Sequence, residues 1–163
     1  MSATDEFIRN NAAYAEEFDS GGLLTPPKKQ VTIVTCMDSR MDIFAILGLN
    51  NGEAHIIRNA GGVVTDDVIR SLAISQRKLG TREIVLIHHT QCGMLTFTDD
   101  EFREELQRDA GMKPPWSPES FHDLDAEVRS SITRIRMSPF IQHKNVRGFV
   151  YDVNDGRLRE VPA

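Results

Sequence analysis

The chain has 163 residues, a length that suits one domain with its own hydrophobic core and no need of disulfides. Its formal net charge is −5 at pH 7 and its lysines and arginines are scattered, which excludes a protein built to bind nucleic-acid phosphates. No run approaches the roughly 20 consecutive apolar residues that span a bilayer, which excludes a membrane-spanning protein.

Residues 1–29 predict a leading helix and a linker. Thr4 is a suitable N-cap for a helix from Asp5 to about Phe18, and the Gly- and Pro-rich stretch 19–29 ends it. A helix of this kind packs on a partner subunit about as often as on its own core. The same region has Asp5 and Glu6 where an export signal would have a basic segment, which favours a cytoplasmic protein.

Residues 30–163 predict an α/β core, because apolar, β-branched runs alternate with amphipathic segments. The expected strands are 31–35, 54–58, 83–89 and 146–152, with a hairpin partner at 158–161, and the expected helices are 42–47, 66–79, 98–109 and 124–137. Such alternation favours a mainly parallel central sheet flanked by helices. We expect a single domain over residues 1–163, made of the leading segment and this core.

Both cysteines of the chain and one of its histidines follow expected strands. Cys36 comes directly after the first strand, His89 ends the third, and Cys92 lies three residues further on. In open α/β sheets, ligands bind in the crevice beyond the carboxyl ends of the strands, so we expect these side chains to meet there. Neither cysteine is spare for a disulfide, which again favours the reducing cytoplasm.

Cys36, His89 and Cys92 form a candidate zinc site with three protein ligands. Thiolate sulfur and imidazole nitrogen are common zinc ligands in proteins. Structural zinc sites usually have four protein ligands, whereas three ligands leave a position at which water can become a nucleophile. The set therefore predicts a zinc-dependent hydratase or hydrolase with one Zn²⁺ per chain.

His88 and His89 are separated by strand geometry, because adjacent side chains of a strand point to opposite faces. Only one of them can share a metal with Cys92, and the H-x-x-C spacing from His89 lets a tight turn bring the thiolate round. We assign His89 to the metal and expect His88 to face a helix or a subunit contact.

Asp38 and Arg40 follow the first cysteine closely and are candidate catalytic residues. As a carboxylate, Asp38 can accept a hydrogen bond from a nucleophilic oxygen, and the Arg40 guanidinium can hold that carboxylate bidentately and keep it ionised. An isolated Asp-x-Arg more often means that the aspartate caps the following helix and the arginine is a surface cation. Here its place directly after a strand-end cysteine favours the catalytic interpretation.

The run Asn59, Ala60, Gly61 and Gly62 follows the second expected strand. Glycine permits positive φ and close approach of the backbone. The run is therefore a candidate substrate-binding segment that presents backbone N–H groups to a substrate oxygen. The alternatives are that it lets the chain pass tightly beside the metal, or that it is an ordinary loop.

Three runs carry a resemblance to a known family. They are CMDSR at 36–40, RNAGG at 58–62 and HTQCG at 89–93, in that order. From about residue 30 to residue 152 the chain resembles the β-class carbonic anhydrases. Within that family it is most similar to the short, mycobacterial-type members of actinobacteria, including the stretches 63–79 and 116–120. Many members have a second glycine where this chain has Met94.

The resemblance implies an α/β fold with a parallel core, zinc held by Cys36, His89 and Cys92, and an orienting dyad of Asp38 and Arg40. It implies reversible hydration of carbon dioxide to bicarbonate and a proton, with zinc-bound hydroxide as the nucleophile. It also implies a homodimer, or a dimer of dimers, with sites near the subunit interface.

Two other functions use the same residues. A hydrolase of carbon disulfide or carbonyl sulfide would use the same zinc ligands. The ligands therefore do not distinguish these linear substrates from carbon dioxide, and specificity lies in the pocket walls. A non-catalytic zinc-binding dimer would have Asp38 as a fourth ligand that closes the site. Either of these is an alternative to carbon dioxide hydration.

Overall fold

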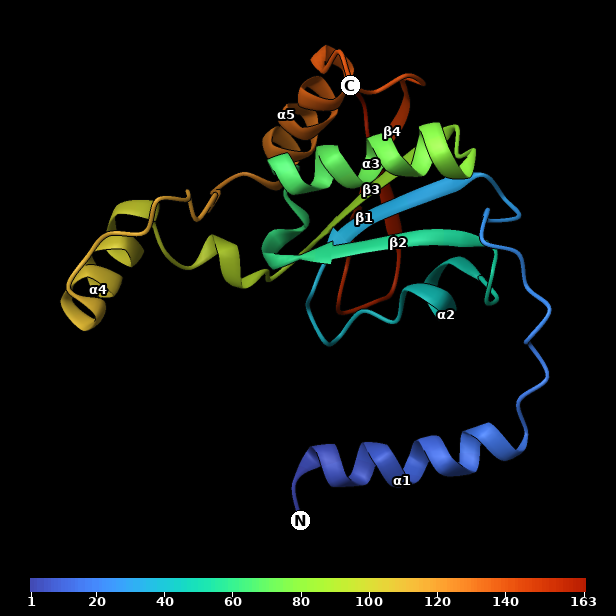
Figure 1. Ribbon diagram of the computed structural model, residues 1–163. Coiled ribbons are helices and arrows are strands. Elements are labelled where there is room, and N and C mark those ends of the chain that lie inside the picture. Colours follow the sequence, from blue (N-terminus) through green and yellow to red (C-terminus); the bar gives the residue numbers. More distant parts are fainter.

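A five-stranded sheet in the order β2-β1-β3-β4-β5 forms the centre of the computed structural model, which describes residues 1–163 (Figure 1). The strands are β1 (Val31–Cys36), β2 (Ala54–Asn59), β3 (Glu83–His89), β4 (Asn145–Tyr151) and β5 (Leu158–Val161). β1 to β4 are parallel and β5 is antiparallel to β4. The predicted α/β fold with a mainly parallel central sheet is thereby confirmed.

The two faces of the sheet bury different clusters of apolar side chains. One face is covered by α3 (Asp66–Leu79) and α5 (Leu124–Met137), as Figure 1 shows. Its core includes Val34, Leu72, Leu86, Val128, Ile132 and Ile135, all less than 3% exposed. The other face packs against the short α2 (Ile43–Leu47) through Ile33, Ile43 and Ile87. Burial on both faces explains why the central strands are almost continuously apolar.

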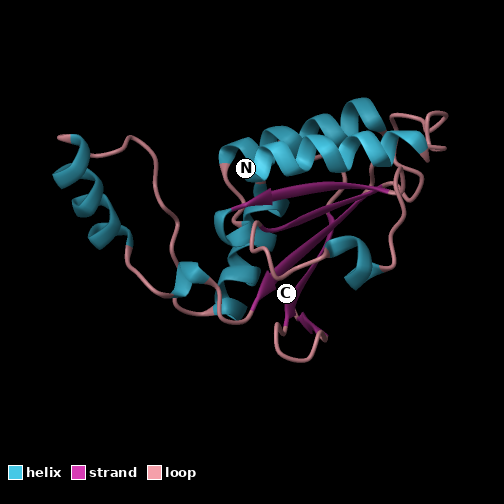
Figure 2. Ribbon diagram, turned by 90° about the horizontal axis from the view of Figure 1, so that it is seen from below, coloured by secondary structure: helices cyan, strands magenta, loops and turns pink.

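Two helices lie outside these layers. α1 (Ala3–Glu16) and α4 (Asp99–Ala110) have no buried residue. α1 lies apart from the sheet in Figure 1, joined by the extended segment that leads to β1. Figure 2 shows α4 standing away from the sheet on two long connections. None of the helices combines the length and the apolar character that a membrane crossing requires.

Most boundaries agree with those expected from the sequence, including β3, β5, α3 and α5. The start of α1 differs: its N-cap is Ser2 rather than Thr4, and the helix ends at Glu16. Ser2 Oγ accepts the N–H of Asp5 at 3.2 Å, and the Asp5 carboxylate accepts the N–H of Ser2 at 2.9 Å. This reciprocal capping box satisfies two free donors at once, which Thr4 as cap could not do.

Candidate functional site

Cys36, His89 and Cys92 meet beyond the carboxyl ends of β1 and β3. Their candidate ligand atoms lie within 4.8 Å of one another, and all three side chains are buried. Cys36 ends β1 and His89 ends β3, while Gln91 has a positive φ of 52° that turns the chain so that Cys92 comes back to the other two. The structure therefore brings together the three residues that the sequence singled out as candidate metal ligands.

The hydrogen bonds of His89 leave one ring nitrogen available to a metal. Its Nδ1 donates to the carbonyl of Thr90 at 2.8 Å, and its Nε2 is buried without a partner. A buried polar atom without a partner is unfavourable unless a ligand completes it. Two sulfurs and one nitrogen suit Zn²⁺, whose bonds of about 2.0–2.3 Å hold neighbouring ligand atoms within about 4 Å of one another. The donor set and the free nitrogen fit zinc, and the ligand atoms are gathered within 4.8 Å of one another.

The two thiols shift each other's pKa in opposite directions. A hydrogen bond from Cys92 lowers the pKa of Cys36 to about 4; burial opposes this shift, while His89 and the backbone N–H groups of Asp38 and Gly61 support it. The same bond with Cys36, together with burial, raises the pKa of Cys92. The pair therefore loses its first proton readily and its second with difficulty. A divalent cation between the sulfurs would displace the second proton.

The pKa of His89 reflects two opposed effects. Burial lowers it, but the adjacent Cys36 side chain, the carbonyl of Thr90 and the nearby charges of Cys36 and Asp38 raise it above its ordinary value. His88 differs, because burial lowers its pKa to about 4. The His88 ring packs edge-on against Phe121 at 5.5 Å, and neither of its nitrogens has a hydrogen-bond partner. His88 stays outside the metal cluster, as the alternation of strand side chains predicts.

Asp38 and Arg40 form a bidentate pair beside the cluster. Arg40 donates from Nε to Asp38 Oδ1 at 3.0 Å and from Nη2 to Oδ2 at 2.7 Å, and its backbone N–H reaches Oδ1 at 2.9 Å. These bonds, with the hydrogen bond from the Arg40 side chain as the largest cause, hold the pKa of Asp38 well below its usual range. Asp38 Oδ2 lies 3.6 Å from His89 Nε2. An ionised carboxylate thus stands next to the free nitrogen.

The helix-cap interpretation of Asp38 does not hold. α2 begins after Asp42, whose side chain accepts the N–H of Ala45 at 3.2 Å. Arg40 donates a further hydrogen bond from Nη2 to the carbonyl of Gln91 at 2.9 Å. The arginine therefore bridges the segment after β1 and the turn that carries Cys92, which is more than a surface cation does.

The segment Asn59–Gly62 passes tightly behind Cys36. Gly62 has a φ of 66°, and a Cβ there would lie 2.9 Å from the backbone N of Cys36 and the backbone C of Thr35. Asn59 Nδ2 donates to the carbonyl of Val63 at 2.8 Å, whereas Asn59 Oδ1 is buried without a partner. Asn59, Ala60 and Gly61 line the adjoining cleft, while Gly62 does not.

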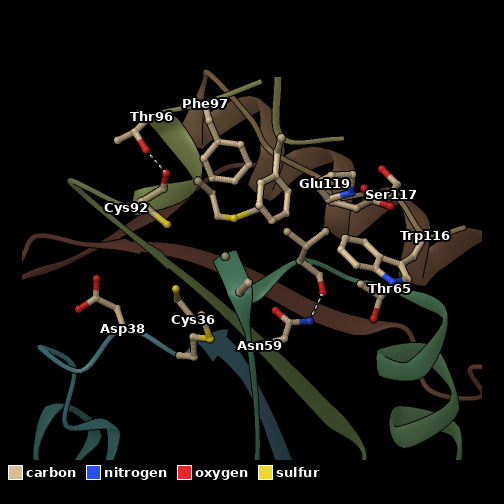
Figure 3. A pocket seen from close by; sticks show the side chains of 18 residues that line it. Cys36, Asp38, Asn59, Thr65, Cys92, Thr96, Phe97, Trp116, Ser117 and Glu119 are labelled. Carbon is tan, nitrogen blue, oxygen red and sulfur yellow. Dashed lines mark hydrogen bonds between the residues drawn. The ribbon is translucent and has the colours of Figure 1, made fainter. Parts of the chain in front are cut away.

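A cleft of about 730 Å³ opens beside the candidate ligands, and Cys36, Cys92 and Asp38 line it. Figure 3 shows Cys36, Asp38 and Asn59 on one side of it and Cys92, Phe97 and Trp116 on the other. Nine of its 18 lining residues are hydrophobic. The aromatic wall was not predicted from the sequence, because Phe97 and Trp116 are isolated aromatics outside the predicted elements, and the pattern of the helix that carries Phe102 does not show which residues it faces.

The wall that carries Trp116 is tied to the start of α4. Asp99 accepts the Ser120 N–H at 2.8 Å, the Ser120 hydroxyl at 2.6 Å and the Ser117 hydroxyl at 3.2 Å. These bonds fix the 117–120 segment at the mouth of the cleft. The pKa of Asp99 is lowered: burial opposes the shift, but the bonds from Ser120 and Ser117 outweigh it.

The sequence and the fold are similar to those of known proteins. A family model described as carbonic anhydrase matches residues 31–158. Beta-carbonic anhydrase 1 of Mycobacterium tuberculosis is 57% identical over 162 residues, which cover 99% of each chain. A carbon disulfide hydrolase of Saccharolobus solfataricus is 50% identical over 182 residues, covering 96% of this chain and 87% of that protein. A carbonic anhydrase of Streptococcus mutans superposes with a TM-score of 0.93, at 49% identity and 99% coverage of both chains.

Proposed function

The chain belongs to the β-class carbonic anhydrases of the mycobacterial type, and we propose that it hydrates carbon dioxide at a zinc ion held by Cys36, His89 and Cys92. The observation that carries the proposal is the free, buried Nε2 of His89, which lies among two thiols and 3.6 Å from an ionised Asp38. The products are bicarbonate and a proton, and the reaction is reversible.

Zinc, when bound, makes a water molecule acidic enough to serve as a nucleophile near neutral pH. Asp38 Oδ2 accepts a hydrogen bond from the attacking oxygen and so turns a lone pair of that oxygen toward the carbon of the substrate. Arg40 keeps Asp38 ionised, since the bidentate bond holds the Asp38 pKa far below neutrality. An ionised carboxylate can only accept hydrogen bonds, so Asp38 selects the orientation in which the attacking oxygen donates.

Carbon dioxide is small, linear and without hydrogen-bond donors, so an apolar cleft can admit it without desolvating a charge. We assign Asn59, Ala60 and Gly61 to the substrate-facing wall, because they line the cleft beside Cys36. Gly62 supports this wall from behind, where only glycine fits against the β1 backbone.

A second candidate substrate is carbon disulfide, because a relative of that name is 50% identical to this chain. The walls of the cleft are apolar enough for either molecule. We favour carbon dioxide, since the relative that is 57% identical and covers 99% of both chains is a carbonic anhydrase. Assays of both substrates on one preparation, with release of hydrogen sulfide as the second readout, distinguish them.

We also propose that the chain acts as a homodimer or a dimer of dimers, with α1 lying on a second copy. α1 buries nothing in its own chain and exposes Phe7, Ile8 and Tyr14, with Phe18 exposed just beyond its end. The double variant Phe7→Asp, Ile8→Asp should sediment as a smaller species than the unchanged protein, because it charges this apolar surface. Arg9→Asp on the same helix is the matched control and should keep the original size.

The two cysteines also indicate the cellular compartment of the protein. Both are free and buried at the site, and a metal there needs them as thiolates. We therefore propose a reducing compartment, the cytoplasm, and a fractionation assay with the untagged protein tests it.

The decisive experiment is stopped-flow hydration of carbon dioxide at about pH 7 and about pH 9, with the zinc content of the same sample measured by mass spectrometry. We expect close to one zinc per chain and turnover that is faster at the higher pH. Full zinc without turnover at either pH would refute the proposal. Fast turnover in a preparation free of zinc would refute the assignment of the metal.

A further inference from the structure

We propose that Arg58 is a positioning residue that holds the backbone of Asp38, so that the Asp38 carboxylate stays at the reacting oxygen. Arg58 belongs to β2, where it pairs in register with Thr35 of β1, one residue before Cys36. The inference rests on the proposed function, because it concerns the same carboxylate.

The guanidinium of Arg58 binds three carbonyl groups of one short segment. Nε donates to the carbonyl of Cys36 at 2.8 Å, Nη2 to that of Asp38 at 2.8 Å and Nη1 to that of Met41 at 3.1 Å. Three carbonyl groups of the segment 36–41 therefore converge on the guanidinium of one side chain. All three nitrogens of the guanidinium are engaged, which fixes both the position and the plane of the group.

The segment 37–42 belongs to no helix or strand, so it has little backbone support of its own. Met37 N–H donates to the carbonyl of Asn59 at 2.8 Å, and Met41 N–H donates to that of Asp38 at 3.2 Å. The contacts from Arg58 are then the main connection between this segment and the rigid sheet. Arg58 belongs to a strand, so its hydrogen bonds anchor this segment to the sheet and restrict its movement.

Two arginines thus fix different parts of Asp38. Arg40 binds the carboxylate, and Arg58 binds the backbone carbonyl of the same residue. Arg58 has no carboxylate within salt-bridge distance and does not line the cleft, so neither an ion pair nor a substrate contact accounts for it. A displacement of about 1 Å at a reacting group can lower a rate about 100-fold, which makes the backbone contact relevant to catalysis.

Lysine cannot replace Arg58 in this role. An ammonium group is a point charge on a flexible stem, whereas the planar guanidinium presents donors to carbonyls that approach from different directions. Arg58→Lys therefore keeps the positive charge and removes the planar array of N–H donors. We expect kcat to fall about 10-fold or more with KM changed less than about 2-fold and about one zinc per chain, because the ligand side chains are untouched.

The matched control is Arg77→Lys. Arg77 Nε also donates to a distant backbone carbonyl, that of Phe140 at 3.0 Å, but in a region remote from the site. This variant should keep the kcat of the unchanged protein. Melting temperature and circular dichroism of both variants show that each has folded, and Arg58→Met provides a second replacement without the charge.

A double-mutant cycle separates positioning of Asp38 from general support of the fold. In protein that already carries Asp38→Asn, Arg58→Lys should lower kcat less than about 2-fold further, because the group it positions is gone. If the two losses multiply, or if Arg58→Lys has the kcat of the unchanged protein, the inference is wrong. Loss of zinc from Arg58→Lys in proportion to its activity would also overturn it. If Asp38→Asn itself is fully active, the proposed dyad fails, which is a different outcome from failure of the inference alone.

Discussion

The polar side chains at the two ends of the parallel sheet differ in whether their hydrogen bonds are satisfied. At the amino end, Ser75 Oγ lies 2.7 Å from each of Thr32 Oγ1, Thr81 Oγ1 and His55 Nδ1, so the network is closed. At the carboxyl end, His89 Nε2 and Asn59 Oδ1 are buried without partners. A closed network stabilises the fold, whereas unpaired polar atoms at the candidate metal site and the adjoining cleft are available to a ligand. The contrast locates function at one end and stability at the other.

The largest effect should come from Cys92→Ser at the carboxyl end. A hydroxyl binds zinc far more weakly than a thiolate, so zinc per chain should fall close to zero and hydration activity should fall about 1,000-fold or more. Ser75→Ala at the amino end is the control and should keep its zinc. Full zinc in purified Cys92→Ser protein would remove Cys92 from the ligand set.

Asp38→Asn should keep its zinc and lose about 100-fold in kcat, because the amide can present a donor where the attacking oxygen needs an acceptor. Asp42→Asn is a matched control four residues further on. Asparagine caps a helix as well as aspartate does, so α2 and the activity should both persist. Activity of Asp38→Asn near that of the unchanged protein would place the catalytic carboxylate elsewhere.

Ser75→Ala should lower the free energy of unfolding by about 2 kcal/mol without changing kcat, since it leaves the buried Thr32 and Thr81 and the half-buried His55 each short of a hydrogen bond. Urea denaturation followed by fluorescence measures the change. Ser71→Ala, one turn earlier on α3, should change it by less than about 0.5 kcal/mol. A loss of turnover in folded Ser75→Ala protein would show that the amino end also serves the reaction.

The smallest effect should come from His88→Leu, which tests an unpaired side chain that lies outside both the metal cluster and the cleft. Neither nitrogen of His88 has a hydrogen-bond partner, so an apolar side chain of similar volume forfeits mainly the contact with Phe121. The free energy of unfolding should change by less than about 1 kcal/mol, and zinc should be retained. A loss above about 2 kcal/mol would mean that an ordered water completes the hydrogen bonds of His88.

Much of the fold could be predicted from the sequence because its local signals agree with the tertiary structure. The β-branched run 31–35 and the caps of α3, Thr65 and Gly80, each point to one conformation. The start of α1 was predicted two residues late, since Ser2 and Thr4 are both good caps and only the side chain of Asp5 decides between them. A choice of that kind depends on one pair of hydrogen bonds rather than on a pattern.

The candidate site could be predicted as a set of residues but not as an arrangement. Cys36, His89 and Cys92 follow strands, so the fold class alone places them at one edge. The contacts of Arg58 were not predicted, because they join a strand to backbone carbonyls, and a carbonyl has no sequence signature. The aromatic wall of the cleft was missed for a similar reason, since Trp116 reaches it through the bonds of Asp99 to a distant segment.

Because Cys36 ends β1 whereas His89 and the turn with Cys92 belong to the end of β3, the three candidate ligands come together only when these strands pair. β1 and β3 are neighbours in the sheet, with Thr35 opposite Ile87, although positions 36 and 89 are far apart in the chain. A chain in which these strands have not yet paired offers a metal only His89 and Cys92. If zinc binds as proposed, its uptake by a refolding chain would follow this long-range pairing, and the bound ion would close a long loop and slow its reopening.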